Sequence, residues 1–195
     1  MKYRLILLVL INIHVNSQVV DINGKVYQTT VIGSNTWINE NLSVDKFNNG
    51  TIIYQAKNFD DWTRAGKEKV PAWCYYDFNP DLSYMGKLYN WYVVSSELEI
   101  SPKGWHVPAD WEWESLDGNK IQSIFRTTGG YLSYDRFKLT PDSFSPTYFG
   151  PWHSNDTSTP YDIILDKYGT SYIQHCFSGC SPESGFTIRC IKDVK

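Results

Sequence analysis

The sequence predicts a single domain of the α+β class, with many short strands, two or three short helices and long irregular loops. Three observations lead to this prediction. Short β-rich runs alternate with turn residues, helical periodicity is confined to brief segments, and residues 18–195 contain neither an internal repeat nor a low-complexity tract. A chain of 195 residues is long enough to bury one substantial hydrophobic core.

Residues 1–17 have the layout of a secretory signal peptide. Lys2 and Arg4 precede an apolar run from Leu5 to Ile13, and a polar segment follows that ends at Ser17. The apolar run is too short to span a bilayer. We therefore expect cleavage after Ser17, export to the cell envelope or beyond, and a domain over residues 18–195 without a membrane span.

The N-terminal part of this domain is predicted to form hairpins. Asn23-Gly24 favours a type I′ turn between strands that begin near Val19 and Lys25. Residues 33–35, Gly-Ser-Asn, predict a second turn before a strand from Thr36.

The middle of the chain mixes strands and helices. Residues 58–71 are predicted to be a loop or a short helix, and residues 72–76 a strand. From Lys87 onward, large side chains recur at helical spacing and predict an amphipathic helix. Residues 101–108 predict a turn and a short strand, and a helix is expected to follow with Asp110 as its N-cap.

The C-terminal part is predicted to contain further short strands. Residues 161–175 predict a hairpin that turns near residues 167–169, and residues 184–194 predict a final strand.

Three tryptophans lie within nine residues in the stretch GWHVPADWEW. Large rings at a junction between a strand and a helix are typical of core side chains, because they bury much apolar surface. We therefore expect Trp105 and Trp113 to be buried and Trp111 to be exposed. His106, in the same stretch, lacks the neighbouring Ser or Cys motif that a catalytic base would activate.

The charge of the chain is modest and evenly distributed. Lys and Arg number 18 and Asp and Glu number 21, without a basic stripe. Nucleic acid is therefore not an expected partner.

Four cysteines follow the predicted leader, at positions 74, 176, 180 and 190. In an oxidising compartment an even number of cysteines predicts two disulfides, and four cysteines allow three pairings. We favour Cys74–Cys190 together with Cys176–Cys180, since Gly179 would supply a tight turn between the second pair.

Several segments together resemble the Fibrobacter succinogenes major paralogous domain family. They are DINGKVYQTTVIGSNTWINENL, GKLYNWYVV, PKGWHVPADWEWESL, GPWHSNDTS and SGFTIRCIKD, in that order over residues 20–193. The resemblance implies a C-type-lectin-like architecture, as in formylglycine-generating proteins, and a secreted or surface-exposed bacterial protein. It implies no particular activity, because none is assigned to the family as a whole.

The candidate ligand-binding residues are Tyr148, Trp152, His153, Asn155 and Asp156, together with Trp111. Five of the six lie in a loop rich in turn-forming residues, and loops on a rigid scaffold commonly carry function. The sequence contains no catalytic motif and no clustered metal ligands, so we expect no cofactor and no catalysis. The leading hypothesis is an exported binding module that recognises a glycan or a cell-surface protein.

Two alternatives remain open. Cys176 and Cys180 precede the C-terminal strand, as the copper-binding cysteines of formylglycine-generating enzymes do, so the resemblance also allows a copper-dependent thiol oxidase. The other alternative is a structural envelope protein without a small ligand.

Overall fold

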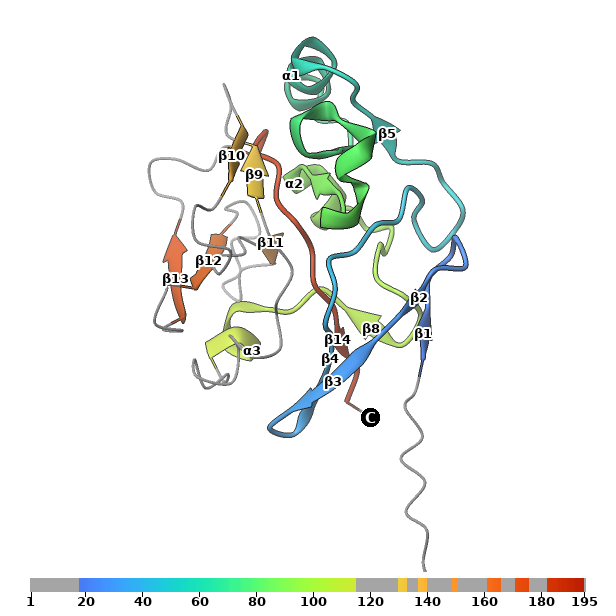
Figure 1. Cartoon of the computed structure of the whole chain (residues 1–195), viewed down its shortest axis with the longest axis vertical. Coiled ribbons are helices and arrows are strands. Elements are labelled where there is room, and N and C mark those ends of the chain that lie inside the picture. The colour runs from blue at the N-terminus through green and yellow to red at the C-terminus, as the bar shows by residue number, and fades with distance from the viewer. Residues whose placement is uncertain are drawn as a thin grey trace, which may run out of the picture.

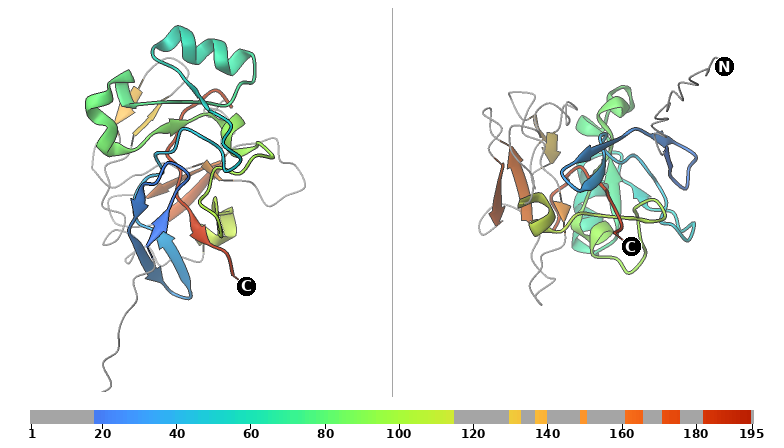
Figure 2. Two further views of the ribbon diagram at one scale, coloured as in Figure 1. Left: turned by 90° about the vertical axis from the view of Figure 1, so that its right-hand side faces the viewer. Right: turned by 90° about the horizontal axis from the view of Figure 1, so that it is seen from below.

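The computed structural model describes residues 18–114, 130–132, 137–139, 149–150, 161–165, 171–175 and 182–194. These residues form small sheets and short helices, which confirms the predicted α+β class (Figure 1). The helices are α1 (Phe59–Lys67), α2 (Trp91–Val94) and α3 (Asp110–Glu114), with two 3-10 helices, η1 (Tyr76–Phe78) and η2 (Pro80–Met85). In two views α1 lies at one end of the molecule, and the N-terminal hairpins lie toward the other (Figures 1 and 2).

The first hairpin pairs β1 (Val19–Val20) with β2 (Val26–Tyr27), as expected, but its turn is not of type I′. Type I′ needs a positive φ at both central residues, and here Gly24 has a φ of 84° while Asn23 does not. The Asp21 carboxylate instead accepts hydrogen bonds from the backbone N–H groups of Asn23 and Lys25, both at 2.9 Å. These hydrogen bonds from Asp21 stabilise a loop that is longer than the two-residue type I′ turn. The positive φ that this loop requires is at Gly24.

The main sheet has the strand order β3-β4-β14-β8 and is antiparallel throughout. Its strands are β3 (Thr29–Ile32), β4 (Asn35–Ile38), β8 (Trp105–His106) and β14 (Ile191–Lys192). The predicted turn at residues 33–35 joins β3 to β4. The strand β14 is central, because Ile191 pairs with both Trp37 and His106. The C-terminal segment thus runs through the middle of the molecule between elements that are distant in sequence (Figure 1).

The second sheet has the order β5-β6-β7 and lies next to α1. Its strands are β5 (Tyr54–Gln55), β6 (Ala72–Cys74) and β7 (Leu88–Tyr89). The predicted helix from Lys87 was therefore partly wrong, because Leu88 and Tyr89 extend and α2 begins only at Trp91. Tyr89 bridges Phe186 on one side and pairs with Trp73 on the other, so sheet pairing overrides the helical periodicity of this segment.

Residues 58–71, which were predicted to be a loop or a short helix, contain helix α1. The Asn58 side chain caps it by accepting a 2.8 Å hydrogen bond from the Asp61 backbone N–H. Asp60 and Asp61 lie in its first turn and Lys67 in its last, as the helix dipole favours. Trp62 is buried on its inner face, where the indole donates to the Glu183 carbonyl oxygen.

Five further strands lie in the part of the chain that is described in separate segments. They are β9 (Gly130–Leu132), β10 (Phe137–Leu139), β11 (Phe149–Gly150), β12 (Tyr161–Leu165) and β13 (Ser171–His175). β12 and β13 pair antiparallel from Tyr161↔His175 to Leu165↔Ser171, which confirms the predicted hairpin. The strands β9 and β10 form a second antiparallel pair, and Leu132 bridges Gly185 in the C-terminal segment.

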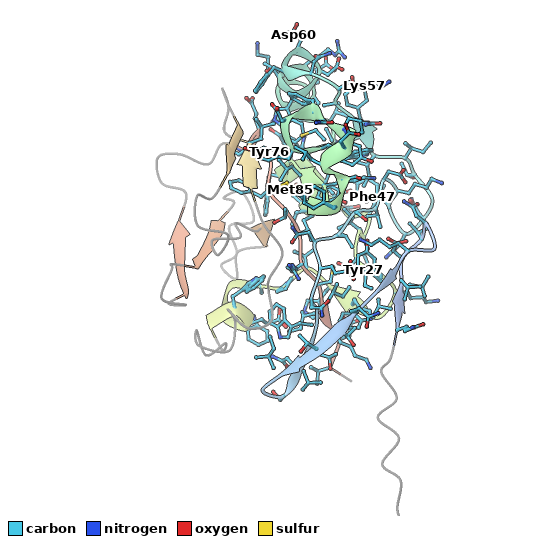
Figure 3. All side chains as sticks on the ribbon, in the orientation of Figure 1. Tyr27, Phe47, Lys57, Asp60, Tyr76 and Met85 are labelled. Carbon is cyan, nitrogen blue, oxygen red and sulfur yellow. The ribbon has the colours of Figure 1, made fainter. Side chains whose placement is uncertain are left out.

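Aromatic side chains dominate the core. Trp105 and Trp113 are buried, with exposures of 8% and 1%, and this confirms the assignment of both to the core. Trp113 packs on Trp37 at a centroid distance of 4.8 Å. Tyr27 and Phe47, labelled in Figure 3, are both buried. In the same view, side chains near α1 extend outward from the molecule.

The preferred pairing of Cys74 with Cys190 is wrong, since both are free, buried thiols. The two residues belong to different parts of the core. Cys74 packs in the cluster around Trp62 and Leu88, whereas Cys190 packs in the larger cluster of the main sheet. The Cys190 thiol instead lies 3.4 Å from Ser101 Oγ, within hydrogen-bond distance for sulfur.

Candidate functional site

The structure places only one of the six candidate ligand-binding residues. Tyr148, Trp152, His153, Asn155 and Asp156 lie outside the described residues, as do Cys176 and Cys180. The pairing of Cys176 with Cys180 therefore stays a prediction. Trp111 lies on α3 with an exposure of 52%, as expected for this tryptophan.

The start of α3 determines why Trp111 is exposed while its neighbours are buried. The helix begins at Asp110, so Ala109 occupies the cap position that had been assigned to Asp110. The Ala109 carbonyl accepts from the Glu112 and Trp113 backbone N–H groups, and Glu112 Oε2 accepts from the Ala109 backbone N–H at 2.8 Å. This is the carboxylate half of a capping box. It holds the Glu112 side chain inward next to the buried Trp113, while the indole of Trp111, one position before Glu112, is exposed to solvent.

His106 lies between two carboxylates from opposite directions. Its Nδ1 is 2.7 Å from Asp193 Oδ1, and its Nε2 is 3.0 Å from both Glu112 oxygens. Each ring nitrogen is thus already in contact with a protein oxygen, whereas a general base needs a nitrogen directed at its substrate. The arrangement ties β14 to α3 through β8 and supports a structural role for His106.

The described thiols are poor nucleophiles. Burial raises the pKa of Cys190 to about 12 and raises the pKa of Cys74 well above its usual value. Both groups are therefore protonated at neutral pH, and the thiolate is the reactive form. Neither cysteine suits thiol oxidation or metal binding in this state.

Lys87 is the titratable residue that the sequence analysis missed. Its side chain is 6% exposed, and its Nζ lies 3.7 Å from the centroid of the Trp73 ring and 3.9 Å from Asp45 Oδ2. Burial lowers the pKa of Lys87 from 10.5 to about 8, against the opposing effect of the Asp45 and Asp21 carboxylates. The sequence offered no signal for this burial, because a lysine beside a glycine usually lies on the surface.

We expect Lys87 to make the free energy of unfolding rise with pH. Between pH 8 and 10.5 the unfolded chain carries a proton on this side chain that the folded protein lacks, so raising the pH favours the folded state. At about 1.4 kcal/mol per pH unit, the upper bound over this window of about 2.5 pH units is about 3.5 kcal/mol. Urea unfolding at several pH values should show this gain in the parent protein relative to Lys87→Met.

Other groups that titrate in this range are common to both proteins, so their effects cancel in the difference. Lys57→Met, which removes an exposed lysine instead, is the control for losing one charge. A difference between parent and Lys87→Met that stays constant from pH 7 to pH 10 would contradict the prediction.

The segments that carry the family resemblance meet in the interior. Arg189, in the terminal RC, is fully buried and donates through Nε to Asn41 Oδ1 of WINENL at 3.0 Å. Asn41 in turn donates to the Met85 carbonyl oxygen at 2.8 Å. Asn90, in YNWY, bonds the backbone of Val70 and Ala72. These signature residues therefore satisfy buried backbone groups and hold the scaffold together.

Neither a metal-binding cluster nor a membrane-spanning helix is present among the described residues. Among them, no group of three or more His, Cys, Asp or Glu side chains is arranged to hold a metal ion. Within the same ranges, every helix is too short or too polar to cross a membrane.

The family model described as the Fibrobacter succinogenes major domain matches residues 31–133, which is more than half of the chain. This range begins in β3 and ends one residue after β9, so it includes Trp111, His106 and Lys87. Comparison with curated proteins and with solved structures gives no match.

Proposed function

The chain belongs to the Fibrobacter succinogenes major domain family, and from this premise we propose that it is an exported, non-catalytic domain that binds a glycan. The recognition surface of the proposal consists of Trp111 and the loop residues Tyr148, Trp152, His153, Asn155 and Asp156. Export rests on the leader-like residues 1–17, and secretion or attachment to the envelope would follow from it.

We also propose a C-type-lectin-like arrangement for the domain. The short antiparallel strands support it, as does the pairing of the C-terminal strand β14 with β4 near the start of the domain. In such an arrangement irregular loops carry recognition, and a rigid sheet positions them.

The exposed indole of Trp111 is the observation that carries the glycan proposal. Its exposure is 52%, while the adjacent Glu112 and Trp113 are 4% and 1% exposed on a helix whose start is fixed by a side-chain cap. An indole held in this way costs little entropy on binding, and its flat face suits the C–H face of a sugar ring. Exposed aromatic side chains are also typical of binding hot spots.

Trp111→Ala is expected to weaken glycan binding by about tenfold or more, because loss of a hot-spot tryptophan commonly has such an effect. A glycan array would identify the ligand, and calorimetry would measure both proteins. Tyr84→Ala is the matched control, since Tyr84 is also aromatic and 70% exposed but lies on η2. Its affinity should equal that of the parent protein.

Equal affinities for the parent and Trp111→Ala would remove Trp111 from the recognition surface. If no glycan on the array bound, and a pull-down from envelope extract captured one protein in a manner that depends on Trp111, the ligand would be a protein and not a glycan. The absence of binding in both assays would favour the alternative that the chain is a structural envelope protein without a small ligand.

The thiol-oxidase alternative requires Cys176 and Cys180 as free thiols. Intact mass under non-reducing conditions distinguishes this alternative, since a disulfide between them lowers the mass by two hydrogens. A free pair that takes up one copper ion would support the oxidase against the binding domain.

A further inference from the structure

A pocket of about 200 Å³ lies between the end of α2, the segment that follows it and β8. The lining includes Val93, Leu98, Glu99, Ile100, Trp105 and Val107. Pockets for drug-sized ligands have volumes of about 300–1,000 Å³, so this one suits a compact molecule. It contains none of the residues of the proposed recognition surface, and the inference therefore goes beyond the proposed function.

The walls of the pocket are mostly apolar and are formed in part by buried core residues. Val93, Ile100 and Trp105 are buried core residues, with exposures of 1%, 4% and 8%. Leu98 is the more open apolar side chain, with an exposure of 36%. A ligand would therefore meet a preformed apolar surface and would not have to order the chain, which reduces the entropic cost of binding.

Glu99 and His106 are the titratable residues that line the pocket. Glu99 is exposed, and His106 is accompanied by the carboxylates of Glu112 and Asp193, so even a protonated His106 leaves an excess of negative charge in that group. Two lysines, Lys103 in the same chain segment and Lys192, which pairs with Trp105 in the main sheet, are exposed, and neither is among the residues that line the pocket.

We propose that this pocket binds a small organic ammonium ion. The apolar part of the ion packs against Ile100, Trp105 and Val107, and the ammonium group lies at the Glu99 carboxylate.

Three probes of nearly equal size and different charge test the proposal. They are benzylammonium, benzyl alcohol and benzoate, titrated to about 20 mM because compact ligands bind weakly. The readout is the NMR shift of the methyl groups of Val94, Leu98 and Val107. Benzylammonium is expected to bind about two- to fivefold more tightly than benzyl alcohol, as an exposed ion pair allows, and benzoate more weakly than either.

Glu99→Gln should abolish the preference for benzylammonium over benzyl alcohol while keeping the pocket. Glu97→Gln is the matched control, because Glu97 is also exposed, lies two residues away and does not line the pocket. It should keep at least most of the preference. Thermal unfolding of both variants would verify that the fold is retained.

Three results with the parent protein would overturn the proposal. Benzyl alcohol could bind as tightly as benzylammonium, the shifts could fall outside the pocket, or no probe could shift the three methyl groups. Equal losses from Glu99→Gln and Glu97→Gln would also overturn it, since they would show a general effect of surface charge.

Discussion

Trp113→Ala is expected to lower the free energy of unfolding by about 3–5 kcal/mol, the usual cost of deleting a buried large aromatic side chain. Trp113 is 1% exposed and packs on Trp37, which is fully buried in β4 of the main sheet. The substitution removes one of the contacts that attach α3 to the sheet, the other being the Glu112–His106 contact, and leaves a cavity. A typical domain has about 5–15 kcal/mol of stability, so this variant should be close to unfolding. Guanidinium unfolding followed by circular dichroism would measure the loss.

Trp111→Ala is the matched control, because it removes the same side chain two positions away on the same short helix. Its indole is half in solvent, and surface substitutions commonly change stability by no more than about 0.5 kcal/mol. Together with the binding assay, the two variants distinguish a loss of stability from a loss of ligand binding. If Trp111→Ala were as destabilising as Trp113→Ala, the proposed recognition role of Trp111 would lose its basis.

Gly86→Ala is expected to lower the free energy of unfolding by about 2–6 kcal/mol, from two effects of about 1–3 kcal/mol each that add. Gly86 has a φ of 86° and a ψ of −158°, a conformation essentially reserved for glycine, and strain of this kind costs about 1–3 kcal/mol. A Cβ atom would also lie 2.6 Å from the Asn41 Cβ and 3.2 Å from the Leu42 carbonyl oxygen. Overpacking of this kind adds about 1–3 kcal/mol. Urea unfolding of the variant would test the sum.

Gly24→Ala separates the two effects of the Gly86 substitution. Gly24 also has a positive φ, of 84°, but a Cβ atom there would meet nothing within 4 Å. It should cost only the conformational term, about 1–2 kcal/mol. Equal losses in Gly24→Ala and Gly86→Ala would show that the close approach to Asn41 contributes nothing.

Gly86 and Asn41 belong to two of the segments that carry the family resemblance, and they lie in close contact in the interior, where they have a structural role. Gly86 packs against Asn41, and Asn41 links Met85 to Arg189 through hydrogen bonds. Loss of the Asn41 or Arg189 side chain would remove a hydrogen-bond partner from a buried polar group, at about 1–3 kcal/mol for each group left unpaired. The proposed ligand-recognising residues are therefore ones that do not belong to this buried network, namely Trp111 with its exposed indole and the residues of the later loop.

Local chemistry alone was sufficient for several elements. Turn residues located the hairpin at residues 19–27 and the turn before β4, and a strand followed by a helix was expected around Trp105 and Trp113. The burial of these two indoles and the exposure of Trp111 also followed from the sequence. Such features depend on neighbours within a few residues, which a sequence displays directly.

The remaining features depend on residues that are far apart in the chain, and only the tertiary structure determined them. Leu88 and Tyr89 are extended because Trp73 and Phe186 pair with Tyr89. His106 is held by Asp193, 87 residues away, and Cys74 and Cys190 stay apart because the fold places them in separate core clusters. The pairing of distant segments minimises buried unpaired polar groups and empty volume over the whole molecule. That optimum cannot be evaluated one segment at a time.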